Sequence, residues 1–248
     1  MTTSLPTRHQ HDGNAEFDDA LAFDAWEVLR PALAAALTGV DPEAGPVLDV
    51  GAGTGLATEV VADTVPDATI VAVEPSRALR AGLMTRIMSR PGLRRRVTVL
   101  PTDLAGARLP ARLGAVVAVN MLGHLAPDER RGFWRLLATR LAPGAPAVIG
   151  LQPPAQPEVV ADTHFTRVQI GDRHYQGWGR ADPTGPETVR WTMTWRVLLG
   201  DQVVDERTGV YDWWTVGDDV VTAELADVGL GAVPGGAGLV IARQPEAP

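Results

Sequence analysis

The run from Val47 to Gly55, VLDVGAGTG, constrains the fold more than any other stretch of this chain. Its first four residues, three of them apolar, predict a short buried strand. Gly51, Gly53 and Gly55 then allow a tight turn and a close approach to a ligand, because they have no Cβ. Residues 56–64 are helical in pattern, so their first amides would face the loop. The sequence therefore predicts a nucleotide site built from a strand, a glycine loop and a helix.

The glycine spacing alone does not say which nucleotide binds. The dinucleotide fingerprint has a third glycine three residues after the second, and Leu56 stands at that position here. A second strand, predicted over residues 71–74, ends in Glu74, which could accept hydrogen bonds from a ribose diol. An acid at this place also occurs in NAD sites. A nicotinamide-dependent enzyme therefore stays an alternative on these residues alone.

Strands and helices continue to alternate after this point. Further strands are predicted over residues 97–100, 115–120 and 147–151, with helices over residues 77–89 and from Pro127 to about Leu141. This alternation is typical of a doubly wound, mostly parallel α/β sheet, which binds ligands at the carboxyl ends of its strands. Gly51, Glu74, Asp103 and Asn120 all follow strands, so we expect them to meet at one edge.

The N-terminal part divides into two segments. Residues 1–14 are expected to be a disordered leader whose histidines are solvated rather than metal ligands. Residues 17–37 have apolar positions at helical spacing, and Pro31 is expected to interrupt that helix. Trp26 either lines a cofactor mouth or packs against the domain.

A different pattern follows the predicted parallel sheet. Strands with alternating polarity are expected over residues 164–170, 173–180, 189–199 and 203–214, which predicts an antiparallel meander. Its apolar face could cover a substrate, contact a second subunit, or pack on its own domain. A helix over residues 218–228 and strands over 230–233 and 239–242 end the chain, with a turn at Gly235–Gly236. The expected units are residues 1–14, 15–154 (core), 155–216 (insert) and 217–248 (completing the core).

Composition excludes several classes of protein. The net charge of −8 argues against a general nucleic-acid binder, and no apolar run approaches the roughly 20 residues of a membrane span. The absence of cysteine removes disulfide and thiolate chemistry, and no metal site is predicted. We expect a cytoplasmic protein. The basic stretch from Arg77 to Arg96 is either a solvated helix face or a site for an acidic partner.

The motifs VLDVGAGTG and VAVEPS, together with the terminal helix and hairpin, resemble class I S-adenosylmethionine (SAM) dependent methyltransferases. The segment NMLGHL at residues 120–125, the meander insert and the segment YDWWT at 211–215 look like one small-molecule branch of that class. That branch contains amino-sugar N,N-dimethyltransferases and is related to glycine N-methyltransferases. The resemblance implies a seven-stranded sheet whose last strand is antiparallel, and SAM as cofactor.

The resemblance also implies a set of site residues. The cofactor would be bound by residues of the glycine loop and of the following strand ends: Asp49, Gly51, Ala52, Gly53, Glu74, Pro75, Asp103, Leu104, Asn120 and Met121. His124 would lie near the acceptor as the catalytic residue, with room beside it left by Gly123. On the residues alone, Asp103 could instead be a helix cap, and His124 could cap the helix that follows it.

The function expected is methyl transfer from SAM to a nitrogen or oxygen of a small-molecule acceptor from secondary metabolism. A homodimer is the assembly considered for it. One departure puts an amino-sugar acceptor in doubt: the sugar enzymes have a tyrosine in the N-terminal helix, where this chain offers Phe17 and Phe23. A SAM-binding enzyme of the same fold that performs another reaction, such as a cyclisation, is the alternative.

Overall fold

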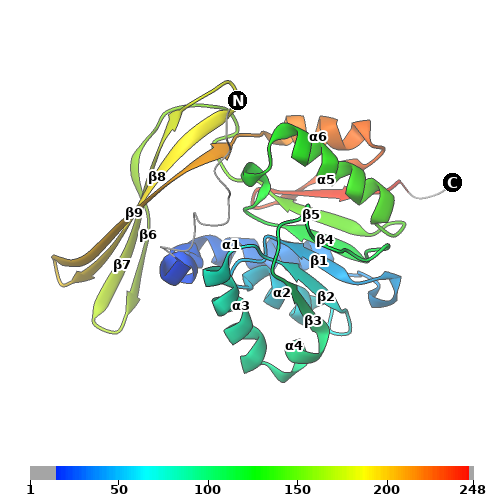
Figure 1. Ribbon diagram of the computed structural model, residues 1–248, viewed down its shortest axis with the longest axis horizontal. Helices are drawn as coiled ribbons and strands as arrows, with labels where there is room; N and C mark the ends of the chain where they lie inside the picture. Colours follow the sequence, from blue (N-terminus) through cyan, green and yellow to red (C-terminus); the bar gives the residue numbers. More distant parts are fainter. Residues whose placement is uncertain (1–14, 246–248) are drawn as a thin grey trace.

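The computed structural model describes residues 15–245, which form two sheets (Figure 1). The expectation of a disordered leader at residues 1–14 lies outside the described residues. The larger sheet has seven strands in the order β10-β11-β5-β4-β1-β2-β3. Its strands are β1 (Val47–Val50), β2 (Ile70–Val73), β3 (Val97–Leu100), β4 (Ala115–Ala118), β5 (Pro146–Gly150), β10 (Gly231–Gly236) and β11 (Leu239–Arg243).

Only β11 runs against the rest of this sheet in the described chain, since it is antiparallel to both β5 and β10. The neighbouring pairs from β5 to β3 are all parallel. The prediction of a doubly wound, mostly parallel seven-stranded sheet is therefore confirmed. Parallel strands end at the same edge, so the loops after β1, β2 and β4 lie next to one another.

Helices cover both faces of the sheet because successive strand residues point to opposite sides. In β4, Val117 belongs to the apolar cluster that includes residues of α1 (Asp18–Leu37), α2 (Leu56–Thr64), α3 (Arg77–Ser89) and α4 (Pro91–Arg96). Val116 belongs to the cluster on the other side, with residues of α5 (Pro127–Arg140) and α6 (Asp218–Asp227). Both faces of the strand are buried, which explains why it reads as a continuous apolar run.

The second sheet is the predicted antiparallel meander, and it projects from the side of the core (Figure 1). It consists of β6 (Val160–Ile170), β7 (Arg173–Pro183), β8 (Thr188–Leu199) and β9 (Gln202–Trp214). Its outer face carries exposed cross-strand ion pairs such as Arg190–Asp212 (2.8 Å). Its inner face packs on the start of α1, where the Phe17 ring lies on Trp195 with centroids 6.4 Å apart.

Two local expectations were wrong, and the short helix α4 was not expected. Helix α1 continues through Pro31, whose exposed ring leaves the open turn facing solvent while Leu29 and Leu33 pack on the core. Pro91 begins α4, where a missing amide costs nothing. The final hairpin turns at 236–238, with Ala237 at φ 51°, and not at Gly235–Gly236.

Part of the basic stretch from Arg77 to Arg96 is bonded within the protein, so the stretch is not simply a solvated helix face. Arg96 donates to the carbonyls of Ala62, Val65 and Ala68, at and beyond the C-terminus of α2, where a cation is favoured by the helix dipole. Arg86 forms an ion pair with Glu59 at 2.7 Å. These arginines hold α2, α3 and α4 together. No helix among residues 15–245 is both long and apolar enough to cross a membrane.

Candidate active site

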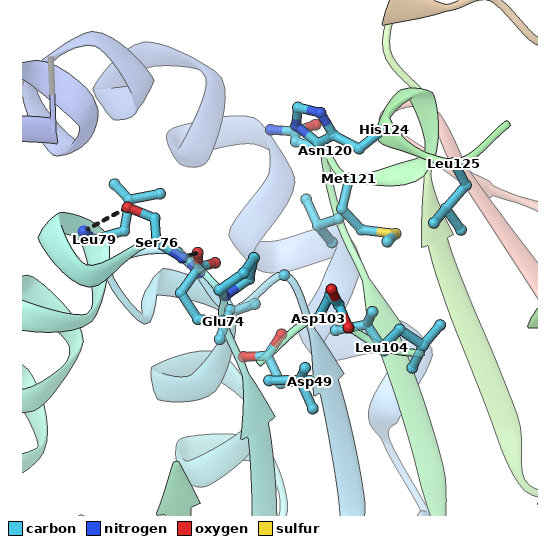
Figure 2. A pocket seen from close by; sticks show the side chains of 18 of the residues that line it. Asp49, Glu74, Ser76, Leu79, Asp103, Leu104, Asn120, Met121, His124 and Leu125 are labelled. Carbon is cyan, nitrogen blue, oxygen red and sulfur yellow. Dashed lines mark hydrogen bonds between the residues drawn. The ribbon is translucent and has the colours of Figure 1, made fainter. Parts of the chain in front are cut away.

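A cavity of about 870 Å³ lies at the carboxyl ends of the parallel strands and extends to the inner face of the second sheet. All eleven site residues expected from the sequence line it: Asp49, Gly51, Ala52, Gly53, Glu74, Pro75, Asp103, Leu104, Asn120, Met121 and His124. In the view of Figure 2, Asn120 and His124 lie at one end of the pocket and Asp49 and Asp103 at the other. The structure thus brings together residues that are spread over 76 positions of the sequence, from Asp49 to His124.

The glycine loop is shaped by its backbone and by Glu74. Gly51 has a φ of 66°, and a Cβ there would lie 2.9 Å from the Met121 Cβ, so a side chain is excluded on both grounds. The Glu74 carboxylate accepts hydrogen bonds from the amides of Gly53 (2.9 Å) and Ser76 (2.7 Å). The loop after β1 and the turn after β2 are therefore joined through one buried carboxylate.

Asp49 lies at the base of the cavity and is 1% exposed. Burial raises its pKa to about 7, against the opposing effect of a hydrogen bond from the Thr58 hydroxyl (2.5 Å), while Glu74 adds to the rise. A buried carboxyl group without a cationic partner carries a cost when it ionises. The charge of Asp49 is therefore sensitive to any cation that enters the cavity.

At the opposite end, β4 is followed by a turn that presents Asn120 and His124. Asn120 has a φ of 54°, a left-handed conformation that asparagine tolerates better than most residues. His124 ends the 3-10 helix η4 (Leu122–His124), and its ring meets the edge of Trp213 at 4.8 Å between centroids. It does not cap α5, since the N-cap is Ala126, whose amide donates to Glu129 at 2.8 Å.

The expected room beside His124 is filled. A Cβ on Gly123 would lie 1.9 Å from Cε2 of Trp213, so the glycine admits the indole of β9 and not a ligand. Asp103 lies beyond β3 on the cavity wall, where its Oδ1 accepts a hydrogen bond from the Gly106 amide at 2.8 Å. It closes a turn and does not cap a helix, because no helix begins there in the described chain.

Sequence reasoning did not assign several lining residues to the site. They come from the start of α1 and from the second sheet: Asp18, Phe165, Met193, Trp195, Tyr211 and Trp213. The period-two pattern of β8 placed Met193 and Trp195 on one face, but it could not say what that face contacts. Trp26 satisfies both interpretations left open for it, since it is buried in the core and also lines the cavity.

Comparison with known proteins adds to this geometry. Residues 47–144 match the family described as a methyltransferase domain. This match covers less than half of the chain. The matched region includes the glycine loop, Glu74, Asp103 and His124.

Solved structures share the fold of this chain. An amino pentose methyltransferase from Micromonospora echinaspora, solved with SAM bound, matches with a TM-score of 0.67 and 22% identity over 99% of this chain and 100% of that chain. A sugar N-methyltransferase from Streptoalloteichus sp. matches with a TM-score of 0.67 and 20% identity over 99% and 98%. The class I interpretation of the sequence is confirmed at the level of the fold.

A curated relative covers a smaller part of the chain. An uncharacterised protein of Synechococcus sp. is 34% identical over 122 residues, which are 48% of this chain. The matched region spans 28% of that protein's length. One region of the chain is therefore similar in sequence to this relative, which gives no information on the acceptor.

Proposed function

We propose that this protein transfers the methyl group of SAM to a nitrogen or oxygen of a small-molecule acceptor, as part of secondary metabolism. The observation that carries the proposal is the continuity of the cavity. One wall is the glycine loop of a methyltransferase domain, and another is the aromatic inner face of the second sheet. The matched solved structures include an amino pentose methyltransferase and a sugar N-methyltransferase, which supports a small-molecule acceptor.

The cofactor end has the donors and acceptors that SAM needs. The backbone of Gly51, Ala52 and Gly53 would border its methionine part, since a Cβ at Gly51 would already meet Met121. Glu74, fixed by two backbone amides, would accept hydrogen bonds from the ribose diol. Asp103 and Leu104 would border the adenine ring, with Pro75 and Met121 as further walls. The buried carboxyl of Asp49 suits a ligand that carries positive charge.

The acceptor end lies between η4 and β9. When bound, SAM would supply an activated methyl group that a nucleophile can attack directly, with S-adenosylhomocysteine as the leaving group. The chain's main tasks are then to align the acceptor and exclude water, and such positioning can contribute about 7–11 kcal/mol. A general base contributes roughly 10²–10⁴-fold in rate. At about 1.4 kcal/mol for each tenfold change, this is a smaller contribution than that of positioning. Asn120 would shape the pocket floor, and His124 would orient the acceptor or take its proton.

We further propose that residues 155–216 form the wall of the acceptor site. Met193, Trp195 and Trp213 line the cavity from this sheet, and Trp195 packs against the cluster of Phe17, Leu21 and Val197. The outer face carries charged pairs such as Arg196–Glu206, which suit contact with water. A homodimer and a cytoplasmic location remain predictions.

The first experiment separates this function from its alternatives. SAM and NAD are each titrated into the protein in a calorimeter, and the protein is then incubated with SAM and a panel of small amines and alcohols. We expect SAM to bind and NAD not to bind. We also expect the mass spectrum to show a product that is heavier than its acceptor by one CH₂ unit. NAD binding without SAM binding would overturn the proposal. SAM binding with conversion of an acceptor at unchanged mass would point to the cyclisation alternative.

A further inference from the structure

The first residue of α1, Asp18, lies in the acceptor half of the cavity. It is partly buried and lines the cavity together with Tyr211 and Trp213 of the second sheet. Its position is fixed by its neighbour Phe17, which is 1% exposed and packs against Tyr175 and Trp195. The carboxyl group is thus held at the junction of α1 and the inner face of the meander.

Asp18 differs in its bonding from the next residue. Asp19 forms an ion pair with Arg86 and accepts a hydrogen bond from the Thr54 hydroxyl. Within residues 15–245, Asp18 has no hydrogen-bond or ion-pair partner. Burial, with a smaller contribution from Asp19, raises the pKa of Asp18 to about 6. At neutral pH this carboxyl group is mostly ionised, and it lacks a partner within the described chain.

Aromatic side chains surround the negatively charged carboxylate of Asp18. Burial, and then the charge of Asp18, raise the pKa of Tyr211, which shows that the two groups share one environment and that the phenol stays neutral. The indoles of Trp195 and Trp213 line the same region. Aromatic faces next to a carboxylate favour a cation over a neutral or anionic group.

The cationic side chains near the cavity do not neutralise Asp18. Arg140 also lines the cavity, but its Nη1 donates to the carbonyls of Leu109 (2.9 Å) and Pro110 (2.9 Å), at the far end of α5. Five carboxylates line the cavity in the described chain: Asp18, Asp49, Glu74, Asp103 and Glu129. Three of them are at the strand ends proposed for SAM, and Glu129 accepts a hydrogen bond from the Ala126 amide at the start of α5. This leaves Asp18 on the side of the second sheet.

We propose that Asp18 binds the ammonium group of the acceptor, so that this enzyme selects an amine and not a hydroxyl compound. This inference rests on the proposed function and narrows its substrate class. The ammonium group must lose one proton to His124 or to water before the nitrogen lone pair forms the N–C bond. The C–S bond breaks at the same time, and its electron pair goes to sulfur. Asp18 is the specificity residue of this scheme and takes no part in the proton transfer.

The test compares two probes of the same shape and different charge. The protein is saturated with S-adenosylhomocysteine, which fills the cofactor end, and is titrated with cyclohexylamine or cyclohexanol at neutral pH. We expect the amine to bind at least about tenfold more tightly than the alcohol, because a paired charge in a desolvated site is worth more than a neutral hydrogen bond. The variant D18N should lose this preference while its affinity for S-adenosylhomocysteine stays within twofold.

Glu27 provides the matched control, because it is an exposed carboxylate on the same helix and does not line the cavity. E27Q changes the net charge by the same amount and should keep the preference for the amine. If the wild type binds both probes equally, or binds neither while S-adenosylhomocysteine still binds, the role of Asp18 is wrong and the proposed function stands. If D18N keeps the preference, Asp18 is likewise not the ammonium site. Failure of S-adenosylhomocysteine to bind would overturn the proposed function itself.

Discussion

His124 ends η4 with its ring against the edge of Trp213, at the boundary between the two halves of the cavity. We expect H124A to lower turnover roughly 10²-fold with little change in SAM affinity, because an imidazole can accept a proton near neutral pH. H124N keeps a hydrogen-bonding side chain that cannot accept that proton. Single-turnover rates across pH, with SAM affinity from calorimetry, measure both effects.

The two variants separate orientation from proton transfer. Recovery of most activity in H124N would show that the histidine orients the acceptor and that solvent removes the proton. Equal loss in both variants, with disappearance of one limb of the rate–pH profile, would identify the base. Wild-type turnover in both would contradict any role in the reaction.

Glu74 is fixed by the amides of Gly53 and Ser76 before any ligand arrives. E74A should weaken SAM binding by on the order of 1.5–3 kcal/mol, because charge-assisted hydrogen bonds to the ribose are lost. Calorimetric titration measures this change, and a denaturant unfolding curve shows how much of it comes from a loosened glycine loop. An affinity within twofold of the wild type would contradict the ribose assignment.

The residues on the strand ends were predictable from sequence because parallel strands bring their carboxyl ends to one edge, whatever the details of the loops. The place of Asp18 in the cavity was not predictable. It depends on the packing of Phe17 against Trp195, two residues that lie 178 positions apart in the sequence. The role of Gly123 was misjudged for the same reason. Local sequence shows that a side chain is missing, but not that the indole of Trp213 takes the space.

At the scale of elements, the contact between η4 and β9 connects the two sheets. G123A should destabilise the fold by about 1–3 kcal/mol, because its Cβ would overlap the buried Trp213 ring and force it to shift. It should also lower turnover more than SAM affinity, since the ring contacts His124. Urea unfolding and steady-state kinetics measure the two effects.

Gly132 gives the control for this substitution. It lies within α5, and a Cβ there meets nothing within 4 Å, so G132A should stabilise the fold by roughly 0.5–1 kcal/mol. A neutral or stabilising effect of G123A would show that the Trp213 ring is free to move away. That outcome would contradict a fixed contact between η4 and β9.

The element pattern was predicted well where periodicity and burial agree, as in α2 and β3, whose predicted and observed bounds coincide. It was predicted poorly where a proline had two possible effects. Pro31 is tolerated in α1 because packing on either side outweighs one lost hydrogen bond, and Pro91 begins a helix as readily as it ends one. Tertiary packing decides such cases, and a single sequence does not contain it.

At the scale of the whole molecule, Asp49 makes stability depend on pH. Its pKa is about 7 in the folded protein and 3.8 by its ordinary value, so the folded state binds more protons between these limits. Stability therefore falls as pH rises from about 4 to beyond 7, by up to roughly 4 kcal/mol. D49N removes this ionisation and should gain stability over the wild type at pH 8, but not at pH 4.

Denaturant unfolding of the protein without SAM, at both pH values, checks this expectation. D67N is the control, because Asp67 is exposed and its replacement should shift stability equally at both. A difference between D49N and the wild type that does not change with pH would show that Asp49 ionises without a cost.

Helix α1 packs on both sheets, because Leu21 and the preceding Phe17 contact the meander while Leu29 and Leu33 pack on the parallel core. A tilt of the second sheet relative to the core would therefore break one set of these contacts unless α1 moved with it. The Thr54 hydroxyl donates a hydrogen bond to Asp19 of α1. A movement of α1 that admits an acceptor would therefore also strain the glycine loop.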